Sequence, residues 1–219
     1  MGTRFYFPAS SGAVVTPTID SAWNDYEDYV SRRLSQTKGT STLAFGSSID
    51  WTSGSKALDR QYVSDKMQSG IEFSTSVTVK GQLVIKESGS NDNVGQIMLG
   101  IRVVSQDGGT VRRTLLAVAG YRAYNETDTT GINRMIADGD ALAPSSSYTT
   151  VEGDRLCIEL GYTDNAGTSI AAQGMWGENG TDLPESESGT SGVGWIEFSN
   201  TITFVTEATA RNTIMLMGL

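Results

Sequence analysis

The stretch from residue 153 to residue 162 constrains the fold more than any other part of the chain. It opens on a Gly-Asp turn and then alternates between apolar and polar side chains. This period of two is the pattern of a β-strand with one buried face. The apolar face carries Leu156, Ile158, Leu160 and Tyr162, and the opposite face carries Arg155, Cys157 and Glu159.

Several other segments repeat this alternation. Residues 72–87 and 95–105 both place branched apolar residues on one face, and the polar turn at 88–93 separates them. The two segments are therefore expected to pair antiparallel. A second turn at 106–109 contains Asp-Gly, which is typical of a hairpin and predicts that residues 111–119 pair with 95–105.

Many short strands separated by turns, without a long helical pattern, indicate an all-β fold. An antiparallel β-sandwich or a barrel fits this pattern, and a jelly-roll sandwich is the preferred choice. A jelly roll would place the last strand, expected at residues 195–204, beside a strand from the N-terminal part. The expected organisation is an N-terminal arm with an aromatic segment at 1–41, a sandwich domain at 42–205 and an apolar tail at 206–219.

The aromatic part of this arm is unusual in composition. Trp23, Tyr26 and Tyr29 follow one another at intervals of three among several acidic residues. Their spacing fits either one helical turn or an irregular aromatic patch.

The charge of the chain argues against two classes of partner. The net charge is −9, and the 16 lysines and arginines are scattered along the sequence. A nucleic-acid groove needs clustered basic residues, and so does binding to an anionic membrane surface. No apolar run approaches the roughly 20 residues of a membrane helix. We therefore expect neither nucleic acid nor a membrane as a partner.

The absence of histidine excludes much enzymatic chemistry. The chain contains no histidine and only one cysteine, so His-dependent catalytic triads and Cys/His zinc sites are excluded. Glu159 and Glu197 are the acids embedded in strand patterns, and both are expected to be solvated residues on an outer face. No catalytic residue is predicted, and the chain is not expected to be an enzyme.

No cofactor is expected, and calcium is the metal for which the loops carry suitable oxygen ligands. Acidic and amide side chains cluster at residues 91–93, 138–140 and 164–165. None of these clusters has the twelve-residue spacing of an EF-hand, so each also fits an ordinary turn.

Aromatic residues on expected loops could stack on sugar rings. The candidates for such glycan contacts are Trp51, Tyr121, Tyr124 and Trp176. Packing in a core or an interface is the favoured interpretation for each of them.

Both ends of the chain are candidates for an assembly interface, because apolar ends are seldom left in water. The tail either folds back on its own domain or adds to a neighbouring subunit. The interface candidates are Arg4, Phe5, Tyr6, Phe7 and Pro8 at the N-terminus and Ile214, Met215, Leu216, Met217 and Leu219 at the C-terminus.

A set of motifs resembles a protein family common in tailed-bacteriophage genomes and viral metagenomes. The similarity covers about residues 3–204 in the same order, and the tail departs from the pattern. The motifs are TRFYFP at 3–8, GIRVVS at 100–105, GDR at 153–155, GTDLPE at 180–185 and WIEFSNTITF at 195–204.

This resemblance implies a virion structural protein, made in the cytoplasm of a bacterial host, and it carries over no catalytic residues. Capsid decoration (cement) is the first expectation, with the protein docking through its termini onto major capsid or tail proteins. A tail, baseplate or fibre component is the alternative, including a glycan-binding module for host attachment. A homo-oligomer is also expected.

Overall fold

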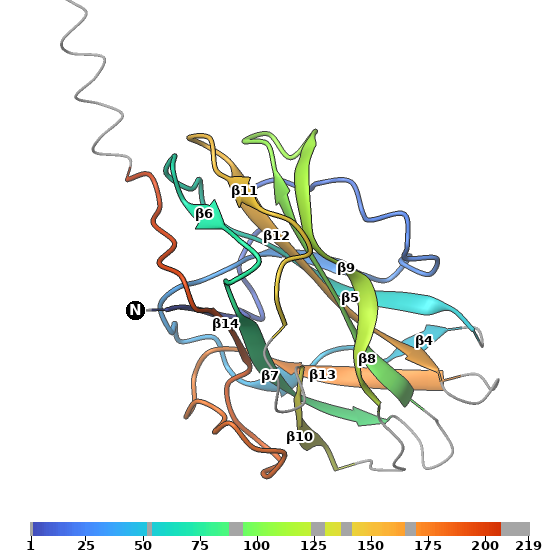
Figure 1. Cartoon of the computed structure of the whole chain (residues 1–219). Helices are drawn as coiled ribbons and strands as arrows, with labels where there is room; N and C mark the ends of the chain where they lie inside the picture. Colours follow the sequence, from blue (N-terminus) through green and yellow to red (C-terminus); the bar gives the residue numbers. More distant parts are fainter. Residues whose placement is uncertain are drawn as a thin grey trace, which may run out of the picture.

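A computed structural model gives the architecture of the chain (Figure 1). Every regular element in its described part is a β-strand, which confirms the predicted all-β class. Helices long and apolar enough to cross a membrane are not found in that part. The described residues are 2–51, 54–87, 94–123, 130–136, 142–164 and 170–206.

The larger sheet has seven strands, all paired antiparallel. The strand order is β1-β14-β7-β13-β3, with β10 also paired to β7 and β4 also paired to β13. The strands are β1 (Thr3–Tyr6), β3 (Ala44–Phe45), β4 (Ile49–Trp51), β7 (Val79–Glu87), β10 (Ile132–Met135), β13 (Ile170–Trp176) and β14 (Trp195–Phe198).

The second sheet has five strands in the order β2-β5-β12-β8-β9, and only β2 runs parallel to its neighbour. A separate two-stranded sheet pairs β11 with β6. The strands are β2 (Val30–Arg33), β5 (Lys56–Val63), β6 (Glu72–Phe73), β8 (Val94–Val104), β9 (Val111–Ala123), β11 (Tyr148–Thr149) and β12 (Arg155–Asp164). The predicted β-sandwich is confirmed, whereas the jelly-roll connectivity stays a prediction.

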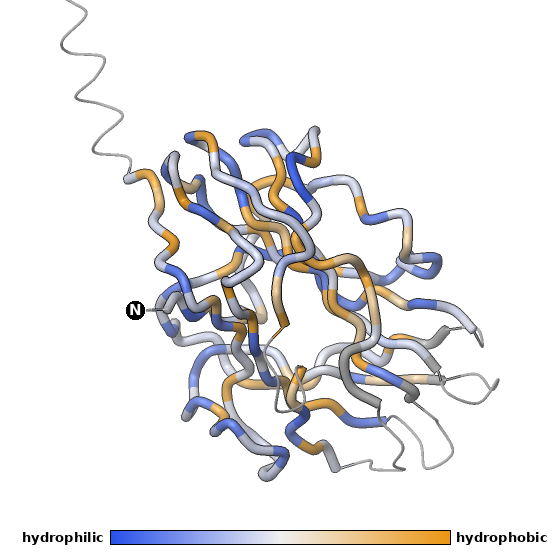
Figure 2. Tube along the Cα trace, in the orientation of Figure 1, coloured by the Kyte–Doolittle hydropathy of each residue, from blue (hydrophilic) through white to orange (hydrophobic). Residues whose placement is uncertain are grey.

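One hydrophobic core lies between the two main sheets. The predicted inward face of β12 is buried as expected, with Leu156, Ile158 and Leu160 at most 1% exposed. Ile196 and Phe198 on β14 belong to the same cluster. Figure 2 shows hydrophobic residues along the strands in the middle of the molecule and hydrophilic residues on the peripheral loops.

The first and last strands lie side by side, as predicted. β1 pairs antiparallel with β14, and Phe5 stands opposite Ile196. The arm predicted to extend from the domain therefore begins as a strand of the larger sheet. Phe5 and Phe7 are each 1% exposed and pack in the core.

One predicted pairing is wrong. β7 and β8 were expected to form a hairpin, but β7 lies in the larger sheet and β8 lies between β12 and β9 in the other sheet. Alternation reveals which face of a strand is buried, and it carries no information about the neighbouring strand. Because both sheets bury one face in the same core, either arrangement satisfies the pattern.

The β8–β9 hairpin is confirmed. Its turn is held by Asp107, whose Oδ1 accepts hydrogen bonds from the Ser105 hydroxyl (2.6 Å) and the Gly109 amide (3.0 Å). Gly108 has a φ of +77°, a conformation that favours glycine. These contacts lower the pKa of the Asp107 carboxyl, the hydrogen bond from Ser105 being the larger cause.

An irregularity between β12 and β5 positions a buried acid. Leu160 stands opposite Arg60, whereas the next residue, Gly161, stands opposite Leu58. Asp59 is the extra residue of this bulge. A Cβ on Gly161 would lie 1.9 Å from the Ala57 carbonyl oxygen, so glycine is needed for the close approach of the two strands.

Candidate functional site

The outer face of β12 is covered by residues 9–29, which we call the strap. Val14 and Val15 of the strap pack against Cys157 and its neighbour Val63. Further along the strap, Trp23 packs against the outward-facing residues of β5 and β8. The polar face of β12 is therefore buried by a segment that is distant in sequence.

Glu159 is the polar centre of this contact. Its Oε1 accepts hydrogen bonds from Arg102 Nη2 (2.5 Å) and Gln61 Nε2 (3.1 Å). Its Oε2 accepts one from the Trp23 indole N–H (2.9 Å), and the Asp20 amide donates to Oε1 at 3.3 Å. Glu159 is only 1% exposed, so the expectation of a solvated residue is wrong. The reason is that the strap, whose contacts no local pattern predicts, replaces water on this face.

Two further hydrogen bonds fasten the strap to the same groups. Arg102 Nη2 donates to the Thr18 carbonyl at 2.9 Å, and Gln61 Nε2 donates to the Pro17 carbonyl at 3.2 Å. Side chains of the sheet thus satisfy both a buried carboxylate and the strap backbone, as buried polar groups require. Burial, together with the charge of Glu159, raises the pKa of the nearby Cys157 thiol to about 12.

An open pocket of about 530 Å³ lies within the strap. Trp23, Tyr26 and Tyr29 line it together with Asp20, and the backbone there is irregular, so the patch interpretation of the aromatic spacing is the correct one. Tyr26 is 46% exposed, whereas Trp23 is 2% exposed. Burial and the charge of Glu159 raise the pKa of Tyr29. The pocket therefore combines aromatic walls with negative charge.

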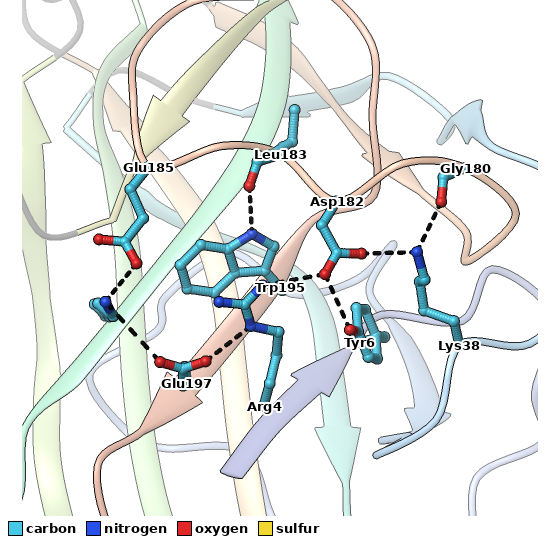
Figure 3. Close-up of polar contacts among 10 residues, drawn as sticks. Arg4, Tyr6, Lys38, Gly180, Asp182, Leu183, Glu185, Trp195 and Glu197 are labelled. Atoms are coloured by element: carbon cyan, nitrogen blue, oxygen red, sulfur yellow. Dashed lines mark hydrogen bonds and ion pairs between the residues drawn. The ribbon is translucent and has the colours of Figure 1, made fainter. Parts of the chain in front are cut away.

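A second network fastens the acidic loop at 177–194 to the larger sheet (Figure 3). Arg4 Nη1 lies 3.1 Å from Asp182 Oδ2, and its Nε lies 2.9 Å from Glu197 Oε2. The same guanidinium stacks over Trp195, with 3.9 Å from Cζ to the ring centroid. The indole N–H of Trp195 donates to the Leu183 carbonyl at 2.9 Å.

Lysines from two other elements complete this network. Lys38 Nζ lies 2.9 Å from Asp182 Oδ1, and Lys80 Nζ lies 2.5 Å from Glu185 Oε1. Partial burial acts to raise the pKa of Asp182, but hydrogen bonds from Lys38, Tyr6 and Arg4 outweigh it and lower this pKa. The loop contains no Lys or Arg of its own, and its Asp182 and Glu185 pair with basic residues distant in sequence.

A larger groove of about 800 Å³ lies between the start of the chain and residues 33–42. Hydroxyl groups of serines and threonines line much of it, and Phe5, Leu34 and Phe204 supply apolar surface. Ser41 Oγ donates to Glu178 Oε2 at 3.1 Å. This pair joins a hydroxyl to a carboxylate without a histidine between them, so it lacks the base of a serine triad.

A second buried ion pair, between Arg60 and Asp59, lies in the core beside Trp176. Arg60 Nη1 lies 2.8 Å from Asp59 Oδ1, and the Tyr162 hydroxyl donates to Asp59 Oδ2 at 3.0 Å. The Arg60 guanidinium lies over the Trp176 ring, 5.3 Å from its centroid. Burial raises the pKa of Asp59 to about 6, although Arg60 and Tyr162 act to lower it.

The residues predicted from the sequence as glycan-contact or interface sites lie in different parts of the structure. Trp176, a glycan-contact candidate, is 2% exposed and packs against Phe7 in the core. Of the N-terminal interface candidates, Arg4 and Tyr6 bind Asp182 within the same chain, and Pro8 is buried beside Phe7. The side chains of Trp51 and Tyr121, the whole of Tyr124 and the tail residues Ile214, Met215, Leu216, Met217 and Leu219 lie outside the described part.

The structure does not test the predictions about metal binding and assembly. The calcium-ligand loops fall largely outside the described residues, among which no group of three or more acidic, cysteine or histidine side chains is placed to hold an ion. The expectation of no cofactor, with calcium as the metal for which the loops carry ligands, stays a prediction, and so does the homo-oligomer. Sequence reasoning missed the role of Asp20 and Arg102, since nothing local marks them as partners.

Comparison with known proteins identifies the fold class without naming a family. No protein-family profile and no curated protein matches the sequence. An α-amino acid ester hydrolase matches in structure with a TM-score of 0.53 at 10% identity, over 90% of this chain and 36% of that chain. A CocE/NonD family hydrolase from Staphylococcus aureus matches with a TM-score of 0.47 at 9% identity, over 91% of this chain and 36% of that one. This chain thus spans about a third of the length of these hydrolases.

Viral capsid chains match far less well. Particles derived from infectious bursal virus give a TM-score of 0.27 at 15% identity, over 78% of this chain and 41% of theirs. The structural match that covers nearly the whole chain is to an α-amino acid ester hydrolase, so the prediction of a virion structural protein, whether a capsid decoration protein or a tail component, is wrong. The resemblance of the sequence motifs to a tailed-bacteriophage protein family stays a prediction.

Proposed function

We propose that this chain is a non-catalytic β-sandwich module that acts by binding. The observation that carries the proposal is the match of nearly the whole chain to about a third of an α-amino acid ester hydrolase. The other two thirds of that enzyme lie outside the match and have no counterpart in this chain. Because a fold does not by itself determine a function, the match supports the shared sandwich, and the binding role is argued from the residues of this chain.

The chemistry of the chain supports this proposal. The sequence has no histidine. Buried carboxylates such as Asp59 and Glu159 are bound to arginines inside the fold and do not line either pocket. The hydroxyl–carboxylate pair of Ser41 and Glu178 is the nearest approach to a nucleophile and base in the larger groove. That pair provides the sharpest internal test of the proposal.

The test is ester hydrolysis by the purified chain. We expect p-nitrophenyl acetate and simple amino acid methyl esters to be hydrolysed at the buffer rate, and a fluorophosphonate probe to leave the protein unlabelled. Saturable turnover that disappears in both Ser41→Ala and Glu178→Gln would overturn the proposal. Ser10→Ala, which removes another groove hydroxyl, is the matched control.

A further inference from the structure

We propose that the aromatic pocket of the strap is a binding site for a small organic ammonium ion. This inference rests on the proposed binding function and names the chemical class of the ligand. The pocket volume of about 530 Å³ falls within the roughly 300–1,000 Å³ typical of small-molecule sites. Tyr26, one of its aromatic lining residues, is 46% exposed to solvent.

Three of the side chains that line the pocket are aromatic, the type of side chain to which a cation is attracted. Trp23, Tyr26 and Tyr29 lie at intervals of three along an irregular segment and line the same hollow. An ammonium group placed over aromatic rings is attracted by the negative charge of their faces, most strongly where water is excluded. Trp23 is fixed by its indole hydrogen bond to Glu159, and Tyr29 packs with it against the sheet. The site is therefore built before any ligand arrives.

The charge around the pocket selects a positive ligand. The strap contains Asp20, Asp25, Glu27 and Asp28 and no lysine or arginine. Arg102 is a basic neighbour of one residue that lines the pocket, with its Nε 3.8 Å from Asp20 Oδ2. Its charge is offset by Glu159 at 2.5 Å, and its side chain is only 5% exposed. Asp20 keeps 22% of its side chain exposed and is the carboxylate best placed to meet an incoming cation.

The position of the pocket connects binding to the fold. Asp20 and Trp23 contribute both to the pocket and to the contacts with Glu159. A cation that rests on these residues would hold the strap more firmly against β12. Ligands that bind only the folded state raise its stability by mass action. Binding should therefore be visible as thermal stabilisation as well as by direct titration.

The experiment is a titration of the purified chain with choline, followed by calorimetry and by ligand-observed NMR at low salt. The neutral isostere 3,3-dimethylbutan-1-ol is titrated in parallel. We expect saturable binding of choline that is at least about tenfold tighter than binding of the isostere, since only the cation gains from the rings and Asp20. Equal affinity for the two compounds, or no binding of choline, would overturn the proposal.

Two pairs of variants locate the site. Tyr26→Ala should weaken choline binding by roughly tenfold, whereas Tyr26→Phe, which keeps the ring, should bind as the wild type does. Asp20→Asn should weaken binding, whereas Glu152→Gln, which removes the same charge from an exposed turn, should not. Thermal melts confirm that each variant is folded. Unchanged affinity in Tyr26→Ala would show that the pocket is not the site.

Failure of this inference and failure of the proposed function are distinguishable. Ester turnover with unchanged choline binding would contradict only the non-catalytic role. Absence of choline binding without ester turnover would contradict only the choice of ligand class.

Discussion

The strap and the acidic loop are both held by charged side chains, yet in different surroundings. In the strap contact the side chains of Arg102 and Glu159 are 5% and 1% exposed. In the loop contact Arg4 and Asp182 are 29% and 28% exposed. The first pair has lost its water and depends wholly on its partners, whereas the second retains part of its hydration. The same attraction therefore has different consequences at the two places.

Breaking a buried pair leaves an uncompensated charge, and breaking an exposed pair returns both groups to water. The strap contact should therefore be sensitive to single substitutions and insensitive to salt. The loop contact should show the opposite behaviour. Three predictions test this contrast and a fourth concerns the buried Asp59 of the core; they follow in order of decreasing effect.

The largest effect is expected from Glu159→Ala. Arg102, Gln61 and Trp23 would each lose their buried acceptor, and the free energy of unfolding should fall by about 3–5 kcal/mol. Urea denaturation at neutral pH measures it. The double variant Glu159→Met with Arg102→Met should recover much of the loss, because it removes both charges. A loss below about 1 kcal/mol for Glu159→Ala would contradict the view that Glu159 and Arg102 form a buried pair that stabilises the strap contact.

A nearly comparable effect concerns the thiol beneath the strap. The pKa of Cys157 is raised from 9.0 to about 12, which lowers the reactive thiolate fraction by about a thousandfold at a fixed pH. Native protein should therefore react with a thiol reagent only as fast as it opens. Glu159→Ala should speed the reaction by loosening the strap. Rapid stoichiometric labelling of native wild type would contradict the burial of this face.

The buried Asp59 predicts a dependence of stability on pH. Its pKa rises from 3.8 in the unfolded chain to about 6 in the fold, so the folded state holds the extra proton between these values. Stability from this group is greatest below pH 4, falls as the pH rises to about 6 and is then constant, a change of about 3 kcal/mol. Asp59→Asn should remove this component from urea denaturation curves measured across the range. An unchanged slope in the variant would rule out Asp59 as its source.

The smallest effect is expected in the loop. Asp182→Asn should lower the free energy of unfolding by about 1 kcal/mol or less, and the difference from wild type should shrink in high salt. The lowered pKa of Asp182 means that its contribution is present at neutral pH and is lost on acidification. Thermal melts at low and high salt measure both effects. A large loss of unfolding free energy that does not depend on salt would show that the loop contact behaves like the buried strap contact.

The sequence predicted well those features that depend on neighbours along the chain. The alternation at 153–162 gave the strand and its buried face, and Asp107 with Gly108 gave the β8–β9 hairpin. Prediction from the sequence failed where two different strand pairings were equally consistent with one pattern of alternation. The expected pairing of β7 with β8 is such a case, because both strands bury one face in the same core.

The candidate site could be predicted only in part. The intervals of three between Trp23, Tyr26 and Tyr29 marked an aromatic patch, and the acids around it were visible. The partners Glu159 and Arg102 were not, because they are more than 70 residues away and carry no local signal. Trp176, although it lies near a loop, is buried in the core, in agreement with the favoured interpretation of the loop aromatics.

By itself the sequence determined the class of fold, the inward face of β12 and the absence of histidine chemistry. These follow from local periodicity and composition, which every segment expresses without reference to the rest. The tertiary structure alone decided that the opposite face of β12 is also buried. Glu159 and Cys157 look like surface residues until the strap covers them, because burial depends on which distant segment displaces the water.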